Sequence, residues 1–300
     1  MIFDFNSAPL VSIVLTSYNQ NKLLKRAFES LQEQTYKNIE IIIVDDYSTD
    51  GSREWIKLIS EAYPEKVKYF LQPVNVGIPK NKNTGFRMAN GVFITYLDGD
   101  DTYYPNKIEK EVERFLIEPS MDVVYSNFDI REYNGQLIKT WATNFLPEGD
   151  IFKNVIIQDF PNGHLHRFEM FKREVMHSLN FYDESFSIYH DLDFMIRYSA
   201  QYKVGSTLNI GSSYFMNPSS IVSNTRQWLM TKQHREVYVK LSHLFVIHGM
   251  ERELKAYLQK SEINLLYSPP QLTVLPYISA IFKQPFKVII IIKALYLSFR

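Results

Sequence analysis

Groups of acidic and polar side chains follow apolar runs of the chain, at the point where each run ends. The three groups are Thr16-Ser17-Tyr18-Asn19, Asp45-Asp46-Tyr47-Ser48 and Asp98-Gly99-Asp100-Asp101. Carboxylates packed this densely repel one another unless a cation lies near them. Asp98-Gly99-Asp100-Asp101 is therefore a candidate site for a hard divalent cation, Mn2+ or Mg2+, which prefers oxygen ligands and completes its shell with water and substrate phosphates. We expect Gly99 to leave room for a ligand to approach the backbone.

A second candidate group, His190-Asp191-Leu192-Asp193, opens a segment with helical spacing. Asp193 has Arg197 four residues on, which predicts a structural salt bridge. Asp191 shares its face with Met195, where desolvation would raise the pKa of its carboxyl toward that of a useful general base. The alternative is that Asp191 has no catalytic role and lies at the helix N-terminus because the helix dipole stabilises a carboxylate there. Position in the sequence alone favours this alternative.

The apolar runs of the first hundred residues predict an α/β layer. Short β-branched runs alternate with segments of helical spacing, an order typical of parallel strands joined by right-handed crossovers. The ligand site of such a sheet lies beyond the carboxyl ends of its strands, so the three polar groups are expected to form one site. The expected strands are residues 11–16, 39–44, 67–71 and 92–97, and the expected helices are residues 23–34, 52–62 and 79–90.

The pattern is looser after Asp101. Asn134-Gly135 predicts the turn of a hairpin over residues 130–143. His164 and His166 alternate on one face of an expected strand, but no third metal ligand lies near them, so we interpret them as pocket or surface residues. Further expected elements are a strand over residues 123–128 and 163–171, and helices over residues 105–118, 173–179, 190–202 and much of 226–260.

Composition excludes several classes of protein. The 300 residues carry 33 Lys+Arg and 33 Asp+Glu, so the basic excess typical of non-specific nucleic-acid binding is missing. The absence of cysteine excludes disulfides, thiolate catalysis and Cys-ligated zinc. The chain contains neither G-x-G-x-x-G nor G-x-x-x-x-G-K, so dinucleotide-binding and P-loop sites have no support. The N-terminus lacks the basic start of a secretory signal, and we expect a cytoplasmic protein.

The C-terminal segment has an unusual composition. Residues 263–282 carry no charge, but three prolines interrupt them, which argues against a transmembrane helix. The basic residues of the last stretch fall on one side of a helix whose other side is aliphatic, as in a helix lying on an anionic membrane. A helix packed on the protein itself is the alternative. The basic residues concerned are Lys283, Lys287, Lys293 and Arg300.

Four ordered motifs resemble those of family 2 inverting glycosyltransferases, which have the GT-A fold. They are VSIVLTSYNQ, IEIIIVDDYSTDGS, NVGIPKNKNTGFRMANGVFITYLDGDD and HDLDFMIR, and together they cover about residues 10–222. The resemblance implies a Rossmann-like, mostly parallel central sheet flanked by helices. We expect a glycosyltransferase domain over residues 1–222, with a nucleotide-sugar half (1–101) and an acceptor half (102–222). A helical extension over residues 223–300 would follow it.

The resemblance also implies roles for individual residues. It makes Asp191 the catalytic base, and Asp98 and Asp100 the D-x-D that binds ribose and metal, with Asp100 the direct metal ligand. The nucleotide-sugar positions are Thr16, Tyr18, Asp46, Lys82, Asp98 and Gly99. We expect acceptor contacts from Trp141, His164, His166 and His190.

The implied reaction moves a sugar from a nucleotide-diphosphate sugar, a UDP-sugar for preference, to a hydroxyl of a saccharide or lipid-linked saccharide, in surface polysaccharide synthesis at the inner membrane face. Three positions depart from the family pattern: Lys82 replaces an Arg, His190 a Glu, and Asn217 a His or Arg. They keep open a non-catalytic nucleotide-sugar-binding scaffold as a second interpretation. Nucleotidyl transfer is disfavoured because the loop over residues 16–25 has no glycine.

Overall fold

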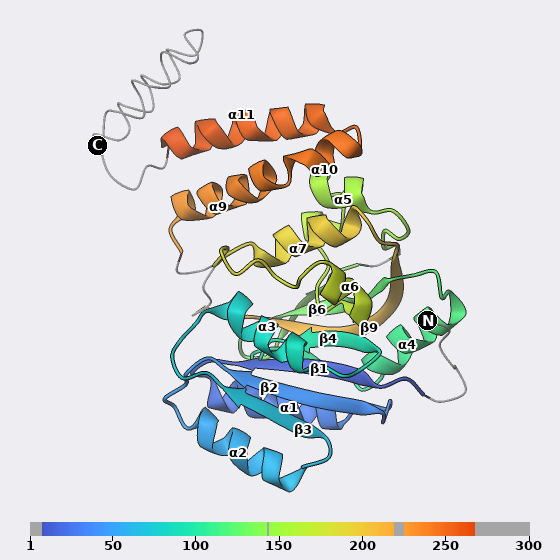
Figure 1. The fold of residues 1–300 in the computed structure, drawn as a ribbon, viewed down its shortest axis with the longest axis vertical. Helices are drawn as coiled ribbons and strands as arrows, with labels where there is room; N and C mark the ends of the chain where they lie inside the picture. Colours follow the sequence, from blue (N-terminus) through green and yellow to red (C-terminus); the bar gives the residue numbers. More distant parts are fainter. Residues whose placement is uncertain (1–7, 143, 219–224, 268–300) are drawn as a thin grey trace. The chain divides into compact units, whose positions relative to one another are not determined.

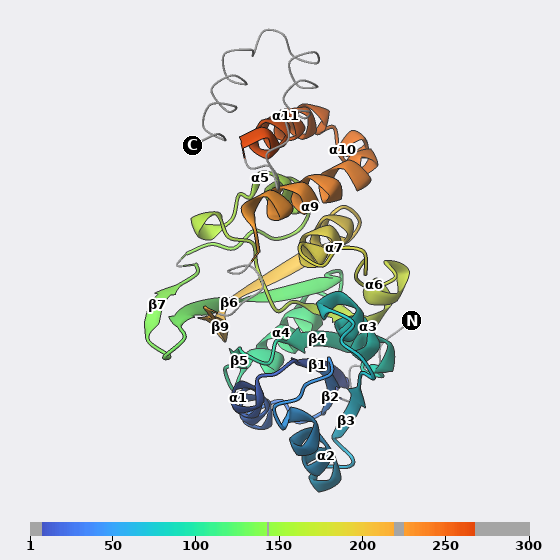
Figure 2. The same ribbon diagram turned by 90° about the vertical axis from the view of Figure 1, so that its left-hand side faces the viewer.

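A computed structural model describes residues 8–142, 144–218 and 225–267. The chain divides into two compact units, residues 1–218 and 219–300. The first unit contains one large mixed sheet with helices on both faces, and the described residues of the second unit form helices (Figures 1 and 2). The expected α/β architecture of the GT-A type, with a helical C-terminal region, is confirmed.

The first half of the sheet consists of four parallel strands in the order β3-β2-β1-β4. Every residue of β2 is buried, as its aliphatic sequence predicts for a strand covered on both faces. The strands are β1 (Val11–Ser17), β2 (Ile39–Asp45), β3 (Val67–Leu71) and β4 (Phe93–Leu97). The helices between them are α1 (Asn21–Gln32), α2 (Ser52–Ala62) and α3 (Ile78–Met88).

The crossovers determine which face each helix covers. The chain moves outward from β1 to β3 through α1 and α2, and returns across the sheet to β4 through α3. Right-handed crossovers therefore place α3 on the face opposite α1 and α2 (Figure 1). In register, Ser17 pairs with Asp45 and Leu15 with Leu97, so the ends of β1, β2 and β4 lie at one edge of the sheet.

The second half of the sheet continues in the order β8-β6-β9-β5, and β7 pairs with β6 as the expected hairpin around Asn134-Gly135. The expected strand over residues 163–171 is wrong for most of its length, because only Met170 and Phe171 of it pair with neighbouring strands. The strands are β5 (Thr102–Tyr103), β6 (Val123–Glu132), β7 (Leu137–Thr140), β8 (Met170–Lys172) and β9 (Val204–Met216). The helices are α4 (Lys107–Ile117), α5 (Phe152–Ile157), α6 (Arg173–Ser178) and α7 (His190–Ser199), with a single 3-10 turn, η1 (Pro161–Gly163).

The second unit contains α9 (Gln227–Lys240), α10 (Ser242–Ile247) and α11 (Glu251–Tyr267). Tyr238 of α9 stacks on Tyr257 of α11 with ring centroids 4.1 Å apart, which ties the first and last of these helices together. Among the described residues no helix has the length and apolarity that crossing a bilayer requires. The basic stripe over residues 283–300, with the expected membrane contact, lies outside the described residues.

Candidate active site

Asp98 is the residue on which the ends of β1 and β4 and the middle of α3 converge. Lys82 Nζ lies 2.7 Å from Asp98 Oδ1, and Thr16 Oγ1 donates a hydrogen bond of 3.0 Å to the same oxygen. Burial raises the pKa of Asp98, but Lys82 and Thr16 outweigh it, so the pKa lies below its usual value. The Lys82 ammonium also lies 4.4 Å from the centre of the Tyr96 ring. The structure thus brings together three residues that the sequence predicts to be functional.

The structure shows why a glycine, rather than a residue with a side chain, stands at position 99. A Cβ built at this position would collide with the backbone oxygen of Thr16, and it would lie 2.5 Å from Gln20 Nε2. The close neighbour is therefore the loop after β1. Gly99 lets the loops after β1 and β4 pack against each other, and through this packing it keeps Asp98 beside Thr16.

Asp100 and Asp101 are held by residues that are distant in sequence. Asn217 Nδ2 donates to Asp100 Oδ2 at 3.1 Å, the Phe215 amide donates to Asp101 Oδ1 at 2.8 Å, and Arg26 donates to the Asp100 carbonyl at 2.5 Å. Burial, followed by repulsion from Asp98, raises the pKa of Asp100; burial also raises the pKa of Asp101 well above its usual value. The carboxylates of this loop therefore repel one another, and a bound cation would reduce that repulsion.

The described residues supply only some of the oxygen ligands that a divalent cation needs. Asp98 and Asp100 offer carboxylate oxygens, whereas no group of three or more His, Asp or Glu residues that could hold a metal exists among the described residues. Mg2+ and Mn2+ sites that use one or two carboxylates take their remaining ligands from water and substrate phosphates. The loop is thus suited to a cation that arrives with a diphosphate.

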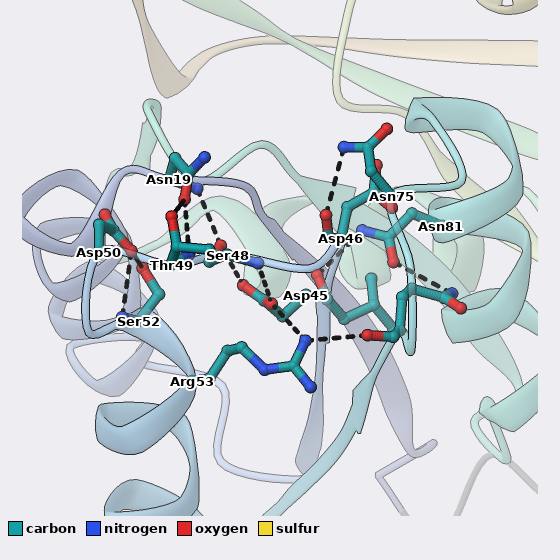
Figure 3. Close-up of polar contacts among 12 residues, drawn as sticks. Asn19, Asp45, Asp46, Ser48, Thr49, Asp50, Ser52, Arg53, Asn75 and Asn81 are labelled. Atoms are coloured by element: carbon teal, nitrogen blue, oxygen red, sulfur yellow. Dashed lines mark hydrogen bonds and ion pairs between the residues drawn. The ribbon is translucent and has the colours of Figure 1, made fainter.

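The loop after β2 is fixed by a network of side-chain hydrogen bonds (Figure 3). Asp45 accepts hydrogen bonds from the Ser48 amide at 2.9 Å and the Ser48 hydroxyl at 2.5 Å, and it lies 3.6 Å from Arg53 Nη1. Asp46 accepts from the amides of Val76 and Gly77 at 2.7 and 2.9 Å. Burial raises the pKa of Asp46 although these amides oppose it. Asp46 therefore joins the loops after β2 and β3, and each of its oxygens keeps one lone pair for a ligand.

Two tyrosines beside this network reach solvent. Tyr18 is 51% exposed and Tyr47 47% exposed, and Arg53 lies 5.5 Å from the centre of the Tyr47 ring. Tyr47 has a φ of 69°, a left-handed conformation that costs a bulky side chain free energy and persists only where the surrounding structure holds it. Sequence reasoning selected Tyr18 and missed Tyr47, although Tyr47 stands in the quoted DDYS motif.

Asp191 occupies the first turn of α7. Its side chain is exposed, and its Oδ1 accepts a hydrogen bond from the Leu192 amide at 2.8 Å. The preceding Tyr189 has a φ of 63°, which turns the chain sharply into the helix. The predicted salt bridge between Asp193 and Arg197 is confirmed at 2.7 Å, and Arg197 also donates to the carbonyl of Phe181. This buried pair anchors the helix that presents Asp191.

His190 connects Asp191 with the loop after β4. Burial lowers the pKa of His190, while the charges of Asp191 and Asp98 act to raise it and the charge of Lys82 acts to lower it. The imidazole is 8% exposed and its Nδ1 has no hydrogen-bond partner in the structure. Asp191 and Asp98 therefore both lie within electrostatic range of His190.

The expected acceptor residues differ in their surroundings. Trp141 is 1% exposed, stacks on Phe128 and donates to the His164 carbonyl at 3.0 Å. His166 is 2% exposed, and burial lowers its pKa to about 3, so it contacts Glu169 as a neutral ring. The acceptor contacts expected of Trp141 and His166 are thus wrong, because both side chains belong to the core. His164 is exposed and stays a candidate.

Arg167 is a charged residue of this region that sequence reasoning missed. Its guanidinium lies 4.2 Å from the centre of the Tyr214 ring. Desolvation lowers the pKa of Arg167, but electrostatic interactions with Tyr214, Asp191 and Asp101 raise it above its usual value. The residue is exposed to solvent. No motif marks this arginine, because its position depends on the tertiary fold.

Comparisons with known proteins identify the family of the chain. Residues 12–188 match the model of glycosyl transferase family 2. The putative teichuronic acid biosynthesis glycosyltransferase TuaG of Bacillus subtilis is 30% identical over 154 residues, which cover 51% of this chain and 60% of TuaG. The chain spans about half the length of several other curated relatives that it matches.

Solved structures share the fold at low sequence identity. TarS of S. aureus, in complex with UDP-GlcNAc, matches with a TM-score of 0.66 at 18% identity, over 89% of this chain and 77% of that one. The mannosyltransferase PcManGT of Pyrobaculum calidifontis, in complex with GDP-Man and Mn2+, matches with a TM-score of 0.60 at 14% identity, over 96% and 86% of the two chains. The family match covers more than half of the chain, which therefore belongs to glycosyl transferase family 2.

Proposed function

We propose that the protein is an inverting glycosyltransferase that moves a sugar from a UDP-sugar to a hydroxyl group of a saccharide acceptor. The observation that carries the proposal is the convergence of Lys82 and Thr16 on Asp98, together with an exposed Asp191 carboxylate at the start of α7. Asp98 and Asp191 both act electrostatically on the buried His190. A nucleotide diphosphate requires positive charge and oxygen ligands, and an acceptor hydroxyl requires a base, and these residues offer both.

The donor assignment is supported by the loops after β1, β2 and β4. The exposed faces of Tyr18 and Tyr47 suit stacking of a base, and the lone pairs left on Asp46 suit its N–H groups. Solved complexes with the same fold hold UDP-GlcNAc in TarS and GDP-Man in PcManGT, which supports a nucleotide-sugar donor. TuaG is named for teichuronic acid biosynthesis, which supports a surface polysaccharide as the product.

The chemistry follows from the position of Asp191. Its exposed carboxylate accepts the proton of the acceptor hydroxyl while the hydroxyl oxygen forms a bond to the anomeric carbon of the donor sugar. The bond from that carbon to the diphosphate oxygen breaks in the same step, and the configuration inverts. Lys82 lies on the donor side and stabilises the negative charge on the departing diphosphate. Asp98 and Asp100 would hold Mn2+ or Mg2+, which supplies further neutralisation of that charge when bound.

Replacing Asp191 by Asn tests the role of the base. The variant keeps the shape of the side chain but accepts no proton, so we expect turnover of the UDP-sugar to fall by about 100-fold or more while the affinity for UDP stays within about twofold. Asp159→Asn, which changes another exposed carboxylate of the first unit, serves as the control. Unchanged turnover in Asp191→Asn would reject the base, and a product with retained anomeric configuration by NMR would reject the single displacement.

Calorimetry distinguishes the enzyme from a non-catalytic scaffold and identifies the nucleotide. UDP, GDP, dTDP and CDP are titrated separately, each with and without Mn2+. We expect UDP to bind most tightly and its affinity to increase with the metal. Binding of UDP without any turnover of UDP-sugars in the presence of diverse acceptors would favour the scaffold.

A further inference from the structure

Three consecutive polar residues of α3, Asn81, Lys82 and Asn83, are buried although they lie in a helix. Successive side chains of a helix point about 100° apart, so the three leave α3 in different directions. Asn81 Nδ2 donates to the Val44 carbonyl at 3.0 Å, near the end of β2. Lys82 reaches the loop after β4. Asn83 binds a third segment of the chain, residues 182–184.

The Asn83 side chain pairs with the backbone of Tyr182 through two hydrogen bonds. Its Nδ2 donates to the Tyr182 carbonyl at 2.9 Å, and its Oδ1 accepts from the Tyr182 amide at 3.1 Å. Nδ2 also donates to Glu184 Oε1 at 3.0 Å, and Arg87 Nη2 of the same helix lies 3.3 Å from that oxygen. The amide group thus uses both of its N–H donors and its oxygen on one short segment. This segment lies in the connection between α6 and α7 (Figure 1).

The same connection is bound to α7, the helix that carries Asp191. The Tyr182 ring packs edge-on against the ring of His190, the residue before Asp191, with centroids 5.1 Å apart. Arg197, in the last turn of α7, donates to the Phe181 carbonyl at 2.8 Å. The connection therefore contacts α7 in its first and in its last turn.

The backbone of this connection is in a conformation that it does not keep by itself. Asn180 and Phe181 have φ values of 53° and 60°, and residues other than glycine hold a left-handed backbone only where the surrounding structure supports it. The Phe181 ring stacks on Phe86 of α3, with centroids 6.4 Å apart and 7° between the ring planes. The contacts from α3 therefore help to hold the connection in the shape that it presents to α7.

We propose that Asn83 is a positioning residue, which sets the position of Asp191 relative to Lys82 through its bonds to Tyr182. The inference rests on the proposed glycosyl transfer, in which Asp191 accepts a proton and Lys82 stabilises the departing diphosphate. Lys82 and Asn83 are adjacent in α3, so one helix fixes both the cation beside Asp98 and the segment that holds α7.

The reaction is sensitive to this position because a single displacement requires the acceptor oxygen, the anomeric carbon and the leaving oxygen to be aligned. A misplacement of about 1 Å costs about 100-fold in rate. A loosened connection before α7 therefore slows the reaction, whereas the loops after β1, β2 and β4, which are proposed to bind the nucleotide, stay as they are.

The test compares Asn83→Ala with Asn81→Ala. The two asparagines are a matched pair, because both are buried in α3 and each donates to one backbone carbonyl, at 2.9 and 3.0 Å. Both substitutions should lower the Tm. In Asn83→Ala we expect kcat for sugar transfer to fall by about 10- to 100-fold, while the affinity for UDP by calorimetry and KM for the UDP-sugar stay within about twofold. Asn81→Ala, which acts on the end of β2, should instead weaken UDP binding and change kcat by less than about threefold.

A double-variant cycle with Asp191→Asn separates positioning of the base from a general loss of structure. The reaction that persists in Asp191→Asn does not use the base, so adding Asn83→Ala should reduce its rate by less than about twofold. Tyr182→Leu removes the ring beside His190 and keeps the backbone bonds to Asn83. It should lower kcat by about tenfold with unchanged affinity for UDP, and it serves as the test if Asn83→Ala does not fold.

Two results would overturn the inference while leaving the proposed function intact. The first is a kcat of Asn83→Ala, or of Tyr182→Leu in its place, that stays at the wild-type value or falls only together with the affinity for UDP. The second is a loss on adding Asn83→Ala that is as large in the Asp191→Asn protein as in the wild type, which would show a purely structural role. Failure of the wild-type protein to bind UDP or to turn over any UDP-sugar would instead contradict the proposed function.

Discussion

The ion pair between Lys107 and Glu111 allows the energy of a buried charge next to the site to be measured. Both side chains are fully buried, with Lys107 Nζ 2.6 Å from Glu111 Oε2. Lys107 also donates to the Phe168 carbonyl at 2.9 Å, and the Ser126 hydroxyl donates to Glu111 Oε1 at 2.7 Å. Burial lowers the pKa of Lys107 and raises the pKa of Glu111, and each residue counteracts the shift of the other. The mutual attraction of the two charges thus offsets part of the large free-energy cost of desolvating them.

Lys107→Met keeps the length of the side chain and removes its charge. The Glu111 carboxylate then stays buried with only the Ser126 hydroxyl as a partner, so we expect the free energy of unfolding to fall by about 3–5 kcal/mol. In the double variant Lys107→Met/Glu111→Gln, no charge stays buried and the amide oxygen keeps the bond from Ser126. Its loss should be about 1–2 kcal/mol, mainly from the hydrogen bond that the Phe168 carbonyl no longer receives.

Urea unfolding followed by near-ultraviolet circular dichroism measures both losses. In Lys107→Met the pKa of Glu111 rises further, so the folded protein can take up a proton there as the pH falls. The deficit should therefore be largest at about pH 8 and shrink toward about pH 5, whereas the double variant should show no such dependence. Lys110→Met, which removes an exposed partner of Glu113 on the same helix, should show no measurable change. A double variant as unstable as the single one would refute the reasoning, because the loss would then come from packing.

Three shorter predictions concern the loops around the site. Asp100→Asn should abolish the increase in UDP affinity that the metal causes and leave the affinity without metal unchanged. Calorimetry with and without Mn2+ measures both affinities. An increase as large as in the wild type would show that the metal binds elsewhere. Gly99→Ala pushes a methyl group into the Thr16 carbonyl, so we expect the affinity for UDP to fall by about tenfold or more, through displacement of the loop. His166→Gln tests the low pKa of His166, which is about 3 in the folded protein. Between this pKa and the higher pKa of the unfolded chain, only the unfolded chain is protonated at His166, and acidification therefore destabilises the wild-type protein. The variant lacks this group, so its free energy of unfolding should fall by about 1.4 kcal/mol less per pH unit than that of the wild type. Equal acid sensitivity of the variant and the wild type would contradict the last prediction.

The first half of the sheet could be predicted from sequence because its signals are local. The expected helix over residues 52–62 and the strand over residues 67–71 agree with the structure at both ends. Each signal comes from the spacing of apolar residues along one segment, and buried parallel strands such as β2 have the clearest pattern. The grouping of Thr16 and Asp98 could be inferred as well, since parallel strands bring their carboxyl ends to one edge of the sheet. Lys82 of α3 is expected at the site only from the family resemblance.

The second half could not be predicted in the same way, because long-range pairing defines it. Residues 204–216 form the longest strand, although their sequence, VGSTLNIGSSYFM, is rich in glycine and serine and has no regular alternation. This strand is stabilised by its pairing with β6 and β5. It delivers Tyr214 to Arg167 and the Phe215 amide to Asp101. Trp141 and His166 failed as acceptor residues for a related reason, because sequence position alone did not reveal their burial.

Three large side chains that adjoin residues of the site have a left-handed backbone. Tyr47, Phe168 and Tyr189 all have positive φ, and each lies next to a residue of the site: Asp46, Arg167 and His190. Such conformations cost about 1–3 kcal/mol each for residues other than glycine and persist only where the surrounding structure holds them. At Phe168 the restraints are visible: its side chain is 1% exposed and its carbonyl is bound by Lys107. The buried Lys107–Glu111 pair therefore stabilises more than the core, because it also helps to maintain the backbone from which Arg167 faces the site.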